Sequence, residues 1–288
     1  MELIPPCPVC GGHTAAPFGT ARGAGPHLHE TQVRCRSCGL VAALPQASDA
    51  ARSAYYEGAY YESRWADAET LFASNRVAYA RTLWPMLVAG WSEHAPGAGA
   101  SVFEVGCGYG ALLAVLRDQG FAVHGVEAGP RAAAFCRAQG LDVRTSLDAD
   151  ASDAGCHDVA IAAYVLEHVS DPAAFLRKLT GLVPVGGAVV IVTDAIWTTQ
   201  YAVERARAAI GRAHAPYRTS TDHTYVFSPR HLRILFERAR CDQVSVRAFT
   251  DPAPRESWHW KAYKGACRVT DRLLGLGEYL MAVGRRVA

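Results

Sequence analysis

The stretch VFEVGCGYGALLAVL, residues 102–116, decides the fold. An apolar strand runs into three glycines at every second position, Gly106, Gly108 and Gly110, and a helical pattern follows. Glycine permits a tight turn between a strand and a helix, and it lets backbone N–H groups approach a ligand closely. The stretch therefore predicts a ligand-binding loop at the end of a buried strand.

Strand and helix patterns alternate on the C-terminal side of this loop. Apolar, valine-rich runs at 101–105, 121–128, 141–146, 157–164 and 187–194 are separated by amphipathic segments, two of which end at Gly120 and Gly140. Two later runs, 243–249 and 279–287, predict an antiparallel edge. The pattern predicts an α/β, Rossmann-like fold with a seven-stranded, mostly parallel sheet and helices on both faces. The ligand site of such a sheet lies at the carboxyl ends of its strands.

The N-terminus carries two matched cysteine pairs. CPVC at 7–10 and CRSC at 35–38 are each followed by glycine, and this spacing can place four thiolates around one Zn²⁺. Free cysteines or a redox pair explain two matched copies less well. We therefore predict a zinc ribbon over residues 1–45 with Cys7, Cys10, Cys35 and Cys38 as ligands. Four protein thiolates leave no open coordination position, so the zinc is expected to be structural.

The segment 46–95 is predicted to join this ribbon to a domain at 96–288, which contains an insertion at 251–277. Residues 44–53 are small and polar and are interpreted as a linker, and a helix is predicted between residues 66 and 89. The tyrosine-rich run YYEGAYYESRW, residues 55–65, either packs beneath a helix or covers a pocket.

The net charge and the hydropathy of the chain limit the partners and the cellular compartment that we expect for the protein. The 288 residues carry a formal net charge of +2, too little for the basic face of a nucleic-acid-binding protein. Neither a signal peptide nor a membrane-length apolar run is visible. We therefore expect a cytoplasmic protein that binds neither nucleic acid nor membrane.

The residue that discriminates between ligands is Glu104. Residues 106–111, GCGYGA, satisfy the dinucleotide fingerprint, so an NAD(P) oxidoreductase is an alternative. A carboxylate two residues before Gly106 would repel a pyrophosphate but attract the sulfonium and ammonium of S-adenosylmethionine (SAM). Glu127, at the end of the second strand, suits the ribose diol of either cofactor.

Three segments in order, EVGCGYG (104–110), GVEAG (125–129) and YVLEHVSDP (164–172), resemble the class I SAM-dependent methyltransferases. The resemblance implies that the glycine loop touches the methionine half of SAM, that Glu127 holds the ribose and that Ser146 and Leu147 flank the adenine. The expected cofactor-binding set is Glu104, Gly106, Cys107, Gly108, Gly110, Glu127, Ala128 and Tyr164. With its four-cysteine front end, the chain also resembles sugar C-methyltransferases of antibiotic pathways and related natural-product enzymes.

Methyl transfer requires alignment of the acceptor with the methyl group and, for a protonated acceptor, a base. A histidine, with its ordinary pKa of about 6.5, suits that task. Two candidates follow strands or lie in substrate-facing loops, His168 in LEHVSDP and His223 in STDHTYVFS. In the sugar enzymes an acidic residue paired with a histidine takes part in catalysis, and Asp222 with His223 matches that pair. Alternatively, His168 serves the fold. Glu167 is interpreted as a helix-start or strand-end charge rather than as a base.

The sequence thus predicts a zinc-containing, SAM-dependent methyltransferase that acts on oxygen or carbon of a small natural-product or sugar-type acceptor. The alternatives are an RNA methyltransferase with a zinc module and a non-catalytic SAM-binding or zinc interaction protein. A second copy of the chain or a carrier protein is considered as a partner.

Overall fold

The computed structural model describes residues 6–21, 30–58, 60, 67–91, 96–146, 153–195, 199, 202, 203, 206, 210, 223–249, 265, 266, 269–271 and 273–288. No helix within these ranges is both long and apolar enough to cross a membrane.

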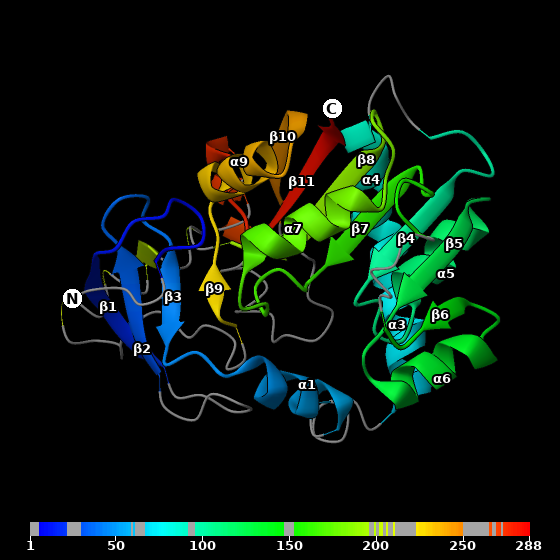
Figure 1. The fold of residues 1–288 in the computed structure, drawn as a ribbon, viewed down its shortest axis with the longest axis horizontal. Helices are drawn as coiled ribbons and strands as arrows, with labels where there is room; N and C mark the ends of the chain where they lie inside the picture. Colours follow the sequence, from blue (N-terminus) through cyan, green and yellow to red (C-terminus); the bar gives the residue numbers. More distant parts are fainter. Residues whose placement is uncertain are drawn as a thin grey trace.

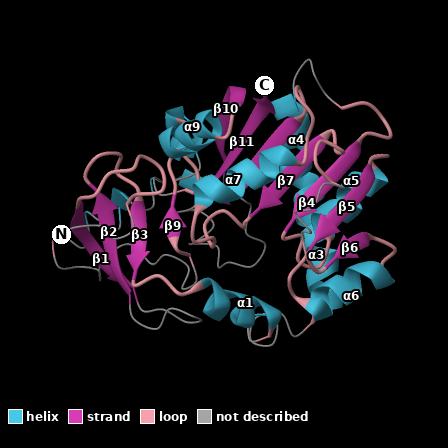
Figure 2. Cartoon of the chain, viewed as in Figure 1, coloured by secondary structure: helices cyan, strands magenta, loops and turns pink. Residues whose placement is uncertain are grey.

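A seven-stranded sheet forms the centre of the larger part of the molecule, with strand order β10-β11-β8-β7-β4-β5-β6. Helices lie against this sheet (Figure 2). Five neighbouring strands run parallel: β4 (Ser101–Val105), β5 (Ala122–Val126), β6 (Asp142–Arg144), β7 (Val159–Ala163) and β8 (Ala188–Asp194). The last two, β10 (Cys241–Phe249) and β11 (Tyr279–Arg286), pair antiparallel at one edge. The predicted fold class and the antiparallel edge are confirmed.

Strands β7 and β8 are buried along almost their whole length because helices cover both faces of the sheet. Every residue of β7 is buried, and β8 is buried up to its last residue, Asp194. Such continuous burial is typical of a parallel sheet covered on both sides. Asp194 breaks the pattern at the carboxyl end of its strand, where ligand sites of this architecture lie.

The helices pack in two layers. Helices α7 (Pro172–Gly181) and α9 (Pro229–Arg238) contribute Leu176 and Leu235 to the core on one face, while α4 (Leu83–Trp91) and α5 (Ala111–Asp118) contribute Leu87 and Leu112 to the other. A further helix, α6 (Pro130–Ala138), packs beside β6. Asp171 caps α7 by accepting hydrogen bonds from the N–H groups of residues 173 and 174, which fixes where the preceding loop ends.

The N-terminal module forms a second sheet from β1 (Ala15–Ala21), β2 (Glu30–Cys35) and β3 (Val41–Leu44), and a late segment, β9 (Tyr225–Val226), completes it. Figure 1 shows β9 beside β3. Val41 pairs with Val226, and the N–H of Ala43 donates to the carbonyl of Thr224 at 2.9 Å. The module is therefore joined to residues 224–226 by backbone hydrogen bonds.

Two helical predictions need correction. The second half of the predicted linker, residues 49–53, belongs to helix α1 (Asp49–Glu57), and the Ser48 hydroxyl caps this helix. The single helix predicted over 66–89 is two helices, α3 (Ala68–Arg81) and α4, separated at Thr82. Pro85 explains the break, because proline lacks an N–H and its ring clashes with the carbonyl four residues earlier. Much of the 251–277 insertion lies outside the described residues.

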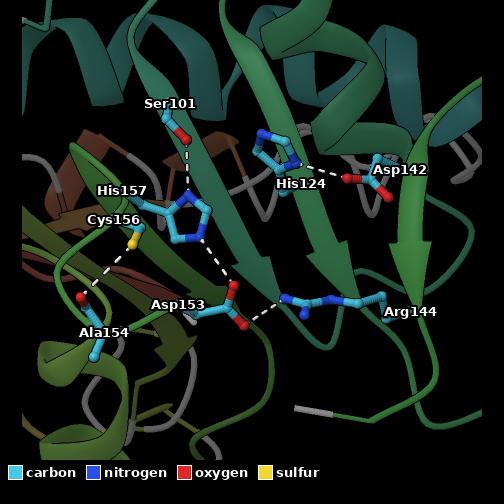
Figure 3. Close-up of polar contacts among 8 residues, drawn as sticks. All are labelled: Ser101, His124, Asp142, Arg144, Asp153, Ala154, Cys156 and His157. Atoms are coloured by element: carbon cyan, nitrogen blue, oxygen red, sulfur yellow. Dashed lines mark hydrogen bonds and ion pairs between the residues drawn. The ribbon is translucent and has the colours of Figure 1, made fainter. Parts of the chain in front are cut away.

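A polar cluster ties the loop after β6 to the sheet (Figure 3). The Ser101 hydroxyl lies 2.7 Å from Nδ1 of His157, whose Nε2 is 3.8 Å from Asp153, and Asp153 pairs with Arg144. Burial lowers the pKa of His157. Ser101 and His157 lie at the amino ends of β4 and β7, the edge opposite the glycine loop. We therefore interpret the cluster as structural.

Candidate functional site

The glycine loop after β4 has the geometry that its sequence predicts. Gly106, Gly108 and Gly110 have φ values of 73°, 55° and 77°, in the left-handed region that other residues rarely adopt. A Cβ at Gly106 would lie 2.5 Å from Cγ2 of Val165, in the loop after β7. Glycine at this position thus allows the loops that follow two neighbouring strands to touch.

Glu127 connects this loop to the next one. It is buried at the end of β5, and its two carboxylate oxygens accept hydrogen bonds from the N–H groups of Gly108 (2.9 Å) and Gly129 (2.8 Å). A carboxylate has about four lone-pair positions, so these two bonds leave acceptor capacity for a ribose diol. Cys107 is buried beneath the loop, and Ala128 is exposed next to Glu127.

Glu104 is the least satisfied group of the loop region. It is 3% exposed, and its Oε2 atom has no hydrogen-bond partner among the described residues. Burial, and then the charge of Glu127, raises the pKa of Glu104 to about 8. A buried carboxyl without a partner is costly. The position therefore fits a ligand that brings positive charge, and the ammonium and sulfonium of SAM meet this requirement.

Tyr164 directly follows β7 and has a φ of 59°, which is uncommon for a residue with a bulky side chain. Its N–H donates to the carbonyl of Val192 on β8 at 2.8 Å. Its ring stacks on Tyr79, with centroids 6.4 Å apart, and meets Tyr279 edge-on at 5.4 Å. Strained backbone of this kind is common at functional sites, and here it directs the chain from β7 into the loop that carries His168.

The two predicted histidines lie together. The ring centroids of His168 and His223 are 4.7 Å apart, with the rings almost perpendicular. Nδ1 of His223 lies 3.0 Å from Oδ2 of Asp194, at the end of β8. Asp222, the expected partner of His223, lies outside the described residues. The carboxylate found against His223 is therefore one that the sequence analysis did not select.

The interpretation of Glu167 as a helix-start or strand-end charge needs correction, because this residue is buried in the turn between β7 and α7. It is 1% exposed, its Oε2 accepts a hydrogen bond from the Thr193 hydroxyl at 2.8 Å, and its Oε1 has no partner among the described residues. Burial raises the pKa of Glu167 to about 7, although His223 acts in the opposite direction. The position of these two acidic residues in the sequence is the signal that could have identified them: Glu167 follows β7, and Asp194 ends the neighbouring parallel strand β8.

Within the part of the chain that the structure describes, two groups of side chains could hold a metal ion. The sulfur atoms of Cys7, Cys10, Cys35 and Cys38 lie within 4.8 Å of one another. Two of the S···S distances, Cys7 to Cys38 and Cys10 to Cys35, are 3.6 and 3.7 Å. A tetrahedral site with Zn–S bonds of about 2.3 Å requires S···S distances of about 3.8 Å, so the four cysteines fit zinc. Ligand atoms of Glu167, His168 and His223 form the second group.

The segment after the N-terminal module packs against His168. The ring of Tyr56, on α1, lies edge-on to that of His168 at 5.6 Å, and Tyr55 and Tyr60 pack against Tyr56. Of the two readings of the tyrosine-rich run, these contacts favour the one in which the tyrosines cover a site. Tyr61 and Leu147 lie outside the described residues, and Ser146 is exposed beyond β6.

The chain is similar to known proteins in sequence and in structure. Residues 77–246, more than half of the chain, match the sequence model of a family described as a methyltransferase domain. A ubiquinone biosynthesis O-methyltransferase of Caulobacter vibrioides is 36% identical over 110 residues, which are 35% of this chain and 44% of the relative. One of the same name from Pseudomonas paraeruginosa is 32% identical over 138 residues, 45% of this chain and 57% of the relative. The chain thus spans about half the length of these curated relatives.

Two solved structures share the fold. A SAM-dependent methyltransferase from Archaeoglobus fulgidus has a TM-score of 0.52 at 15% identity and covers 80% of this chain and 100% of its own. Phosphoethanolamine N-methyltransferase 2 of Haemonchus contortus, solved with SAM, has a TM-score of 0.54 at 9% identity and covers 80% and 60%. At such identities the likeness concerns the fold alone. The family match, together with the glycine loop at the carboxyl edge of the sheet, places the chain in the methyltransferase domain family.

Proposed function

We propose that the protein transfers a methyl group from SAM to an oxygen atom of a small molecule. The observation that carries the proposal is the contact between the two loops at the centre of the sheet. The glycine loop follows β4, the histidine loop follows β7, and a Cβ at Gly106 would overlap the Val165 side chain. The strand order reverses between these strands, which is where ligands bind in such sheets.

On the cofactor side, Glu104 would face the positive charge of SAM, the N–H groups of the glycine loop would approach its methionine half, and Glu127 would hold the ribose. Tyr164 and Cys107 would line the same side, and Ser146 and Leu147 would flank the adenine. When bound, SAM supplies a methyl group already activated by positively charged sulfur. The protein's task is then to align the acceptor and to take up its proton.

On the acceptor side, His223 is the group that we propose as the base. Asp194 holds its Nδ1, which fixes the orientation of the ring, and His168 packs against it. A base oriented by a carboxylate is the arrangement that proton removal requires. His168 and Asp222 remain candidates for contact with the acceptor. The zinc proposed at Cys7, Cys10, Cys35 and Cys38 would hold the module in place and take no part in the chemistry.

Oxygen is favoured over carbon as the acceptor atom because the sequence relatives are named O-methyltransferases. A natural-product or sugar-type intermediate remains our proposal for the acceptor, with Tyr56 and Tyr60 as part of the cover. We propose that it reaches the site from solution in the cytoplasm.

The test is methyl transfer by the purified protein from isotope-labelled SAM to a panel of phenols, hydroxylated polyketides, nucleotide sugars and RNA, with S-adenosylhomocysteine measured by mass spectrometry. His223→Ala should lower kcat at least ~100-fold while the Kd for SAM changes less than about twofold. His124→Ala, on β5 against Asp142, is the control and should retain turnover. Unchanged turnover in His223→Ala would remove that histidine from the mechanism, and methylation of RNA alone would replace the proposed acceptor class.

A further inference from the structure

Arg52, in the first half of α1, is a buried cation with several backbone contacts. It is 9% exposed, and its Nη1 donates hydrogen bonds to the carbonyl oxygen of His168 and, at 2.8 Å, to the hydroxyl of Thr224. Its Nη2 donates to the carbonyl of Ala47 at 3.0 Å. Burial of a guanidinium is costly unless its donors are bonded, so these contacts hold the side chain in one position.

The contacts of Arg52 join the two loops that carry the histidines. His168 belongs to the loop after β7, whereas Thr224 directly follows His223 and precedes β9. The same two loops also meet where the N–H of Thr224 donates to the carbonyl of Glu167 at 2.7 Å. One guanidinium nitrogen, Nη1, bridges both loops from a third element, helix α1, while Nη2 bonds to Ala47 just upstream of that helix.

Helix α1 is itself anchored at both sides of this bridge. Tyr56, four residues after Arg52 and hence on the same helix face, packs against the His168 ring. Upstream of α1, the side-chain amide of Gln46 donates to the hydroxyl of Tyr225 at 2.7 Å, and that hydroxyl donates to the carbonyl of Ser170 at 2.9 Å. Residues 46–56 therefore contact both histidine loops at three points along the chain.

We propose that Arg52 is a positioning residue for methyl transfer, which sets the distance and orientation between His168 and His223 by bonding to both of their loops. The proposal rests on the proposed function for its consequence, because the pair must meet an acceptor. The hydrogen bonds of Arg52 to His168, Thr224 and Ala47 are to two main-chain carbonyls and one hydroxyl.

The test uses full-length, metal-replete protein and three variants. Arg52→Met keeps roughly the length of the side chain but removes its donors. Arg52→Lys retains the charge and one donor nitrogen but lacks the second nitrogen that bonds to Ala47, so it should hold the bridge only in part. Arg76→Met is the matched control, because Arg76 is exposed on α3 and pairs with Asp118 away from the site. If Arg52→Met does not fold, Thr224→Val removes one acceptor of the bridge and takes its place.

Two readouts separate positioning from a merely structural role. The imidazole ¹H–¹⁵N signals of His168 and His223 should move in Arg52→Met and, less, in Arg52→Lys, and stay fixed in Arg76→Met. With the best acceptor from the panel, kcat should fall roughly 10- to 100-fold in Arg52→Met and be partly rescued in Arg52→Lys. The Kd for SAM, measured by calorimetry, should change less than about twofold.

Unmoved histidine signals, or an unchanged kcat in a folded Arg52→Met, would overturn the proposal and leave the proposed function standing, because the wild-type protein still turns over. An equal loss of SAM affinity and kcat would also overturn it, since Arg52 would then act on the whole fold. Wild-type protein that binds SAM but methylates no acceptor would contradict the proposed function, and Arg52 would then have no reaction to position.

Discussion

Replacing Glu104 by glutamine tests whether a buried carboxyl is kept for a cationic ligand. The pKa of Glu104 is about 8 in the folded protein, against an ordinary value of 4.5, chiefly because of burial. Between these two pH values the folded protein keeps a proton that the unfolded chain has lost. Stability therefore falls as pH rises through this window.

The magnitude follows from the width of the window. One pKa unit corresponds to about 1.4 kcal/mol, so the rise from pH 4.5 to 7 costs the wild-type protein roughly 3 kcal/mol of unfolding free energy. Glutamine does not titrate. The stability difference between Glu104→Gln and wild type should therefore grow in favour of the variant by roughly 3 kcal/mol from pH 4.5 to pH 7.

Urea unfolding followed by circular dichroism at pH 4.5, 6, 7 and 8 measures this difference, with Glu237→Gln, at an exposed position on α9, as the control. The same variant should bind SAM roughly 10- to 100-fold more weakly, because a charge-assisted contact to the cofactor is lost. A stability difference that does not change with pH would refute the reasoning about burial. Unaltered affinity for SAM would refute the assignment of Glu104 to the cofactor.

Three further substitutions probe the loop, the N-terminal module and the base. Gly110→Ala should destabilise the protein by about 1–3 kcal/mol through its positive φ, with an additional loss because the new Cβ would lie 2.5 Å from Cδ1 of Leu141. Gly120→Ala, with positive φ but open space around the Cβ, should show only the first effect. Urea unfolding measures both variants. Cys10→Ser should lower the zinc content from one ion per chain, measured by elemental analysis, and weaken the thiolate absorption of the cobalt-substituted protein, because one of four thiolates is lost. Asp194→Asn should lower kcat by at least ~10-fold with SAM affinity unchanged in calorimetry, because His223 loses the carboxylate that orients it.

These three substitutions have separate contradicting results. Equal destabilisation by Gly110→Ala and Gly120→Ala would mean that the contact with Leu141 is unimportant. Full zinc content in Cys10→Ser would exclude Cys10 as a ligand. Wild-type turnover in Asp194→Asn would show that another group orients the base.

The fold was predictable because its signals are local and repeated. Valine-rich strands, helices that end at Gly120 and Gly140, and the glycine loop each follow from a few neighbouring residues, and the seven-stranded sheet with an antiparallel edge is confirmed. The helix break at Thr82 could also have been predicted from the sequence, because Pro85 lies about one turn after it. The apolar spacing over residues 66–89 alone predicts one helix, whereas the structure has two.

The site was predictable only in part, since it depends on contacts between distant segments. His168 and His223 were selected from their places after a strand and in a polar loop, and the structure brings them together. Prediction of Asp194 and Glu167 as site residues requires knowing that β7 and β8 are neighbouring strands. Arg52 could not be predicted as a site residue from the sequence. Nothing near residue 52 indicates that the segment following the cysteine pairs contacts loops more than one hundred residues later in the chain.

The most direct test of the central claim is calorimetric titration of the metal-replete protein with SAM, S-adenosylhomocysteine and NADH. The glycine loop with an unpartnered Glu104 beside it predicts micromolar binding of the first two ligands and no binding of the third. Binding of NADH, or no heat with SAM, would contradict the assignment of this loop and the mechanism built on it.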